Sequence, residues 1–270
     1  MVDYRVAAAL FSDRVEKEYW FETEALREAR RQLDALNEER SCEPIFLLGA
    51  PGTGKSSLLA ALNESMQTKG YRVVFFSEPF FSQKDFFIRI LDEVGVHGIE
   101  NIHKLREAAL AHYENIDHLV IIDEAQLASM EILEFLRTLS DTGKIRILFA
   151  MHLREGEALL RRPHFRARRH RCITLQPLDR KDTERFIVDR LQYANLKDAS
   201  RLFDKKTAKF IHLYSKGNFR LIKRMAEKIL LLLDEVETTG YRPLKPKRRK
   251  EGASRCLIDM AALDLGLLHA

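Results

Sequence analysis

Pro-Ile-Phe-Leu-Leu-Gly-Ala-Pro-Gly-Thr-Gly-Lys-Ser-Ser-Leu-Leu occupies positions 44–59 of this 270-residue chain. Residues 49–56 of this stretch fit the phosphate-binding pattern G-x-x-x-x-G-K-[ST]. The apolar residues before the pattern predict a buried strand, and the residues after it predict a helix. The three glycines allow the backbone angles that turn successive N–H groups toward one phosphate. A chance glycine-rich turn is the alternative, but the flanking strand and helix favour a nucleotide-binding loop.

The residues of this loop have separate expected roles. The helix that follows adds its free N–H groups and the positive end of its dipole. Lys55 is expected to reach the β- and γ-phosphates, and the Ser56 hydroxyl is expected to bind Mg²⁺. The predicted ATP-binding residues are Gly49, Ala50, Pro51, Gly52, Thr53, Gly54, Lys55, Ser56 and Ser57.

A second motif, His-Leu-Val-Ile-Ile-Asp-Glu-Ala-Gln, occupies residues 118–126. Its apolar run predicts a buried strand that ends at Asp123, at the edge where parallel sheets bind ligands. Asp123 is expected to hold Mg²⁺ through water, together with Ser56, and to contribute to nucleotide binding. Glu124 is placed to orient and deprotonate an attacking water. On its own the motif also fits a strand end with two solvated acids, but the loop upstream favours ATP hydrolysis.

Composition limits the class of protein. The chain is 46% hydrophobic and 31% charged, with a formal net charge of +5, so a uniformly basic nucleic-acid binder is not indicated. The three cysteines are widely separated, which argues against a disulfide framework or a zinc site. No apolar run is long enough to span a bilayer. We therefore expect a cytoplasmic protein, with peripheral attachment at an inner membrane only through a partner.

The remaining pattern predicts an α/β fold, a P-loop NTPase core with a parallel sheet of five strands flanked by helices. Strands are expected at residues 45–48, 72–76, 119–122, 145–150 and 172–175, and helices at residues 23–40, 57–69, 82–94, 102–113 and 130–139. After Pro177 only helical patterns follow, at residues 179–193, 205–214, 218–233 and 256–268. They predict a small C-terminal helical lid domain.

Four parts of the chain are expected from these patterns. They are a nucleotide-binding core with an N-terminal helical extension (residues 1–176), a helical lid (177–239), a basic linker (240–254) and a C-terminal helix (255–270).

The two nucleotide motifs and the helical C-terminal part resemble an AAA+ ATPase. More narrowly, the chain resembles the ExeA/GspA-like ATPases of type II secretion and of type IV or mannose-sensitive pilus biogenesis. The narrower resemblance rests on Phe-Leu-Arg-Thr-Leu-Ser at 135–140, Leu-Gln-Pro-Leu at 175–178, Gly-Asn-Phe-Arg at 217–220 and Met-Ala-Ala-Leu-Asp-Leu-Gly-Leu at 260–267. It implies a Mg²⁺-dependent ATPase that forms a homo-oligomer, a ring or a filament, on ATP.

The resemblance also implies roles for residues outside the two motifs. An arginine before the fifth strand would reach into a neighbouring subunit's ATP. Arg168 matches best by spacing, with Arg166 or Arg169 as alternatives. Arg220 would contact the γ-phosphate from the lid and so take part in nucleotide binding. His152, at the tip of the fourth strand, is the candidate for a first sensor of the γ-phosphate, although these ATPases usually carry Gly-Gln-Pro-Glu-Leu where this chain has Ala-Met-His-Leu-Arg at 150–154.

Two functions remain open. The first is an assembly or remodelling factor whose protein partner belongs to a pilus or secretion machine. The second is a DNA-bound ATPase of the transposition type, similar to TniB and MuB, or of the replication-loading type. DNA would then meet two basic segments: Arg161, Arg162, Arg166, Arg168, Arg169 and Arg171, and the stretch from Lys245 to Lys250. A nucleotide switch with little turnover is a third option, which Glu124 disfavours.

Overall fold

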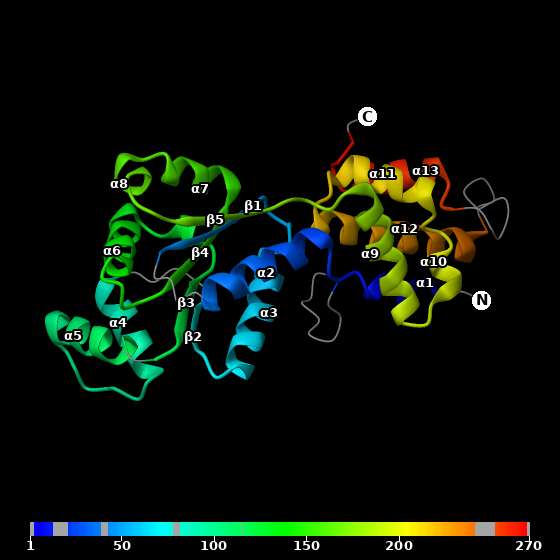
Figure 1. The fold of residues 1–270 in the computed structure, drawn as a ribbon. Coiled ribbons are helices and arrows are strands. Elements are labelled where there is room, and N and C mark those ends of the chain that lie inside the picture. The colour runs from blue at the N-terminus through cyan, green and yellow to red at the C-terminus, as the bar shows by residue number, and fades with distance from the viewer. Residues whose placement is uncertain are drawn as a thin grey trace. The chain divides into compact units, whose positions relative to one another are not determined.

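The computed structural model describes residues 3–12, 21–38, 43–77, 82–114, 116–240 and 252–268. The chain forms two compact units (Figure 1). Glu24–Gln176 makes the sheet-containing core, and Met1–Thr23 joins Pro177–Ala270 in a helical unit. Each unit has its own buried apolar cluster, so each is described separately.

The core is built on one parallel sheet of five strands, as the sequence predicts, and the strand order is β2-β3-β4-β1-β5. The strands are β1 (Ile45–Gly49), β2 (Arg72–Phe76), β3 (His118–Ile122), β4 (Ile147–His152) and β5 (Arg171–Leu175). Because all strands are parallel, their carboxyl ends share one edge. Strand β4 lies between β1 and β3, so the two strands that carry the nucleotide motifs flank it.

Helices cover both faces of this sheet (Figure 1). The helices of the core are α2 (Glu24–Glu38), α3 (Lys55–Thr68), α4 (Gln83–Asp92), α5 (Ile102–Tyr113), α6 (Met130–Ser140), α7 (Leu153–Leu160) and α8 (Pro163–Arg166), with the 3₁₀ turn η1 (Ala125–Leu127). Alternate strand residues such as Phe46, Val120 and Phe149 pack against α4 to α8. Helices α2 and α3 contact β1, β2 and β5 and cover the other face.

The helical unit contains α1 (Tyr4–Ala9), α9 (Arg180–Tyr193), α10 (Lys197–Ser200), α11 (Lys205–Ser215), α12 (Phe219–Thr239) and α13 (Arg255–Asp264). Side-chain caps begin the predicted helices: Asp179, Asp204 and Asn218 accept hydrogen bonds from backbone N–H groups in the first turns of α9, α11 and α12. Phe11 is 1% exposed and contacts the rings of Phe186 and Phe203.

Two short motifs that are far apart in sequence meet in this unit. The Leu178 N–H donates to the Gly217 carbonyl oxygen at 3.0 Å. Gly217 has a φ of +75°, and a Cβ there would lie 2.1 Å from the Leu178 carbonyl oxygen. Only glycine fits this approach. The Leu-Gln-Pro-Leu and Gly-Asn-Phe-Arg motifs thus have a structural reason to occur together.

Several sequence-based boundaries need correction. The fourth strand runs from Ile147 to His152 instead of 145–150, because the Arg146 N–H donates to the His118 imidazole at 3.0 Å and regular pairing begins one residue later. Helix α12 continues to Thr239, and helices α1, α7, α8 and α10 were not predicted. The N-terminal segment packs with the C-terminal helices instead of extending the core. Its Phe11 is buried against Phe186 of α9 and against Phe203, just after α10. The basic stretch 245–250 lies outside the described residues.

Among the described residues, no helix combines the length and the apolar character needed to cross a membrane.

Candidate nucleotide-binding site

The loop at residues 49–56 follows the carboxyl end of β1 and leads into α3. Gly52 and Gly54 have φ values of +72° and +92°, as the glycine pattern predicts. The Thr53 side chain turns inward and donates to the Ala50 carbonyl oxygen at 2.9 Å. Ser57 is exposed in the first turn of α3. The loop therefore ends at a helix N-terminus whose first N–H groups are free to face an anion.

Lys55 is folded over this loop. Its Nζ donates to the Gly49 carbonyl oxygen at 2.9 Å and to the Ala50 carbonyl oxygen at 3.3 Å. Burial lowers the pKa of the Lys55 ammonium, although the nearby carboxylates of Glu124, Asp123 and Glu155 oppose that shift. A buried ammonium with only carbonyl partners gains most from an added anion. Lys55 is thus positioned for a phosphate group.

Ser56 and Asp123 meet across the loop, although 67 positions separate them in sequence. The Ser56 hydroxyl donates to the Asp123 Oδ2 at 2.9 Å. Asp123 is 6% exposed, and its N–H donates to the Phe76 carbonyl oxygen at 2.9 Å, which fixes its backbone beside β2. A hydroxyl and a carboxylate beside a phosphate loop are ligands that Mg²⁺ prefers, with waters completing the shell. The residues present fit Mg²⁺ bound together with a nucleoside triphosphate.

Glu124 lies at the same edge and is held by three contacts. Its backbone has a φ of +49°, in the left-handed region, and its N–H donates to Asp123 Oδ1 at 2.9 Å. Its Oε2 accepts from Gln126 Nε2 and lies 3.3 Å from His152 Nε2. A left-handed backbone at a non-glycine residue costs free energy and often marks a functional site.

Gln126 is a site residue to which the sequence reasoning assigned no role. Besides donating to Glu124, its Oε1 accepts from the His152 N–H at 3.2 Å. One amide thus joins Glu124 to the end of β4. The signal was present in the sequence, because Gln126 ends the Ile-Ile-Asp-Glu-Ala-Gln motif.

His152 occupies the position expected for a first sensor. It is the last residue of β4 and pairs in register with Gly49, the first residue of the phosphate loop. Its imidazole is 30% exposed beside Glu124. The structure therefore brings Lys55, Ser56, Asp123, Glu124 and His152 together at one sheet edge.

The arginine-rich segment lies at the opposite edge of the sheet. Arg171 begins β5 and pairs in register with Ile45, whereas the phosphate loop starts where Gly49 pairs with Leu175. Four strand residues span roughly 13 Å. Arg168 precedes β5, so it does not reach the phosphate loop of its own protomer.

The six arginines of this segment differ in their ion pairs. Arg161 pairs with Glu157 at 3.4 Å, Arg168 with Asp141 at 3.9 Å and Arg171 with Glu43 at 2.9 Å. Arg162, Arg166 and Arg169 are exposed and have no ion pair within the described part of the chain.

Arg220, the predicted lid residue, lies in the first turn of α12, directly after the Phe219 that opens this helix. It belongs to the helical unit, whereas the phosphate loop belongs to the core. Its role toward the γ-phosphate stays a prediction.

The sheet order, the loop and the site residues define an AAA+ P-loop NTPase fold. A family model described as "AAA domain" matches residues 38–160, which lie within the core. No curated protein sequence matches the chain.

Several solved structures share this fold. The chain is similar to Cdc6p from Pyrobaculum aerophilum, with 15% identity and a TM-score of 0.60 over 86% of this chain and 66% of that one. The chain is 10% identical to Drosophila ORC bound to DNA, with a TM-score of 0.67 over 97% of this chain and 65% of that one. It is 14% identical to the Aeropyrum pernix ORC2 protein in ADPNP–ADP complexes, with a TM-score of 0.58 over 94% of this chain and 71% of that one. The chain thus spans just under two thirds of the Cdc6p and Drosophila ORC chains.

Proposed function

We propose that this protein binds ATP with Mg²⁺, hydrolyses it in an oligomer, and couples hydrolysis to an action on DNA. The observation that carries the ATPase part is the cluster formed by Ser56, Asp123 and Glu124 at the carboxyl edge of the sheet. ORC2 was solved in ADPNP–ADP complexes, which supports a nucleotide at this fold's site.

In this proposal the chain's residues divide the chemistry. Loop N–H groups and Lys55 bind the phosphates, and Ser56 with Asp123 hold Mg²⁺. Mg²⁺ supplies charge neutralisation on the phosphate oxygens when it is bound. Glu124 orients a water and accepts its proton, while His152 contacts the γ-phosphate. Arg220 from the lid and Arg168 from a neighbouring protomer complete the site, because charge on the γ-phosphate grows during transfer.

Gln126→Ala is expected to lower kcat about 10-fold while leaving the binding of an ATP analogue unchanged. The amide holds Glu124 but lies outside the phosphate loop, and one hydrogen bond to a charged group contributes about 1.5 kcal/mol or more. Steady-state hydrolysis and analogue titration measure the two effects. Gln67→Ala, on the exposed side of α3, is the matched control. Equal kcat for both variants would remove Gln126 from the site.

The DNA part rests on Arg162, Arg166 and Arg169, whose exposed guanidinium groups have no ion pair among the described residues. Guanidinium groups without an acidic partner suit phosphates, which accept two parallel N–H bonds. The likeness to Drosophila ORC, solved bound to DNA, supports the same partner.

The triple alanine variant of these arginines is expected to weaken duplex-DNA binding in the presence of ATP. The slope of log K against log salt should shrink by about one for each phosphate that the variant no longer neutralises. A salt series measured by fluorescence anisotropy tests this. The control replaces three arginines that already pair with acids one turn away: Arg27, Arg89 and Arg201. An equal weakening in both triples would argue for a general charge effect and against this surface.

The second candidate is an assembly or remodelling role in a pilus or secretion machine, with peripheral placement at an inner membrane through its partner. The Gly217–Leu178 contact favours this second candidate only indirectly. The contact explains why two of the motifs behind the ExeA/GspA-like resemblance occur together. If the wild-type protein fails to bind duplex DNA at every salt concentration of the series, this candidate becomes the better one.

A further inference from the structure

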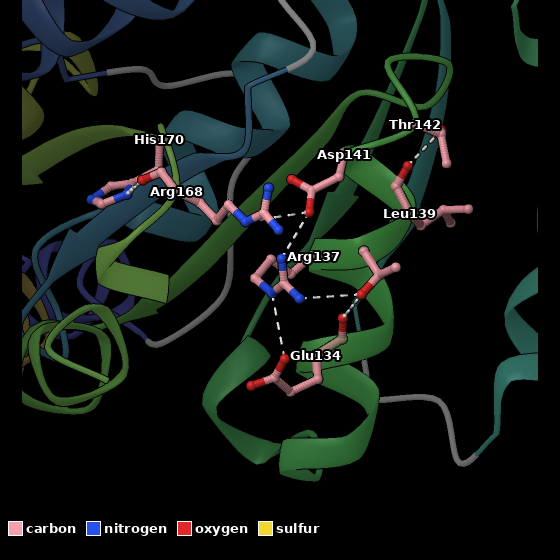
Figure 2. A network of polar contacts seen from close by, with 8 residues as sticks. Glu134, Arg137, Leu139, Asp141, Thr142, Arg168 and His170 are labelled. Carbon is pink, nitrogen blue, oxygen red and sulfur yellow. Dashed lines mark hydrogen bonds and ion pairs between the residues drawn. The ribbon is translucent and has the colours of Figure 1, made fainter. Parts of the chain in front are cut away.

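Asp141 forms two ion pairs at a position in the fold that disfavours a carboxylate. It is the C-cap residue of α6, where the negative end of the helix dipole disfavours a carboxylate. Its Oδ2 lies 2.8 Å from Arg137 Nη1 and 3.9 Å from Arg168 Nε (Figure 2). One carboxylate oxygen thus joins α6 to the segment that precedes β5.

Arg137 holds this carboxylate in place. Its side chain is only 13% exposed, and its Nε also pairs with Glu134 at 3.4 Å (Figure 2). The guanidinium carbon lies 6.0 Å from the centre of the Phe165 ring. Flanked by two acids and a ring, Arg137 is restrained, and it restrains Asp141 in turn.

The backbone at Arg168 is also anchored. Its N–H donates to the Phe165 carbonyl oxygen at 3.2 Å. Its own carbonyl oxygen accepts from His170 Nδ1 at 3.1 Å (Figure 2). Phe165 is 3% exposed, and the His170 ring contacts Phe46. The Arg168 side chain thus starts from an anchored backbone and lies beside a restrained acid.

The contact between Asp141 and Arg168 involves only one of the three guanidinium nitrogens. Asp141 faces Nε, and the terminal Nη1 and Nη2 groups of Arg168 have no partner in the described part of the protein. The side chain is 59% exposed, so these two groups are available to a molecule outside the protomer. Two parallel N–H donors match two oxygens of one phosphate.

We propose that Asp141 is a positioning residue that aims Arg168 at the nucleotide phosphate of a neighbouring protomer. This rests on the proposed function, in which Arg168 acts between protomers. It also selects Arg168 over Arg166 and Arg169, because no acid of the described residues pairs with either of those two.

The test compares steady-state ATP hydrolysis of four forms of the full chain: wild type, Asp141→Asn, Arg168→Ala and the double variant. Asparagine keeps the shape of the side chain but removes its charge. We expect Asp141→Asn to lower kcat about 10-fold, since small misplacements of a reacting group are costly, with KM and ATP-analogue binding unchanged. The double variant should equal Arg168→Ala. Glu93→Gln, at the C-cap of α4 and paired with Arg89, is the matched control.

Two outcomes would overturn the positioning role alone. In the first outcome, Asp141→Asn lowers kcat by the same factor in the Arg168→Ala protein as in the wild type. That result would show that the two residues act independently. In the other, Asp141→Asn raises kcat, which would mean that Asp141 restrains the arginine.

Mixed oligomers separate these outcomes from failure of the proposed function. Arg168→Ala subunits have an intact Glu124, and Glu124→Gln subunits have an intact Arg168, so a mixture should recover activity above either variant alone. Asp141→Asn mixed with Glu124→Gln should recover in the same way. If the first mixture recovers nothing, Arg168 does not act between protomers and the proposal falls with it.

Discussion

Replacing Lys55 with alanine is expected to abolish ATP binding at micromolar concentrations. The ammonium is folded over the loop with carbonyl oxygens as its hydrogen-bond acceptors, and a nucleotide would supply two phosphates in their place. Each hydrogen bond to a charged group is worth about 1.5–3 kcal/mol. Removal of two such bonds predicts an affinity lower by about 10²–10⁴-fold. Isothermal titration with a non-hydrolysable ATP analogue measures it.

The control for this experiment is Lys69→Ala, which removes an ammonium just past the other end of α3. Lys69 is 49% exposed and pairs with Asp34 at 3.8 Å, so its removal should leave the affinity unchanged. Because Lys55 is buried, Lys55→Met is a second variant that keeps most of the apolar stem in place. Tight binding by a folded Lys55→Met protein would contradict the assignment of the loop.

Replacing Glu124 with glutamine is expected to leave ATP binding within a few-fold of wild type and to lower hydrolysis about 10²–10⁴-fold. That is the range that a positioned general base contributes. Glutamine keeps the shape of the side chain but cannot accept the proton of the attacking water. Single-turnover hydrolysis, measured beside analogue binding, separates the chemical step from affinity.

Glu131→Gln is the matched control, since Glu131 is an exposed acid in the first turn of α6, a few residues beyond Glu124. Turnover of the Glu124→Gln protein at the wild-type rate would show that another group activates the water. It would leave the phosphate loop assignment intact, because Lys55 and Ser56 are separate from this step.

The sequence alone predicted the local parts of this protein well. Helix α5 and strand β2 have the boundaries that their apolar patterns predict. In the phosphate loop Gly52 and Gly54 have the positive φ values that their residue type implies, whereas Gly49 does not. Such features depend on neighbours in the chain, namely periodicity, caps and glycine positions. The parallel sheet followed from the alternation of strands and helices.

The sequence missed the short helices α7 and α8 and the true start of β4 for a physical reason. They depend on contacts with distant residues. Residue 156 of α7 is a glycine whose Cβ would lie 2.3 Å from a Leu48 methyl, so that helix is set by its packing on β1. The start of β4 depends on the hydrogen bond from Arg146 to His118.

Residue types and spacing therefore indicated which side chains we propose to bind phosphate and metal, because that chemistry depends on short motifs. The tertiary structure alone decided which side chains meet. It joined Ser56 to Asp123, placed Gln126 between Glu124 and His152, and set Arg168 beside Asp141 at the far edge of the sheet. The physical reason is the arrangement of the strands. Their order puts β4 between β1 and β3, and their parallel direction puts the residues before β5 one strand length away from the phosphate loop.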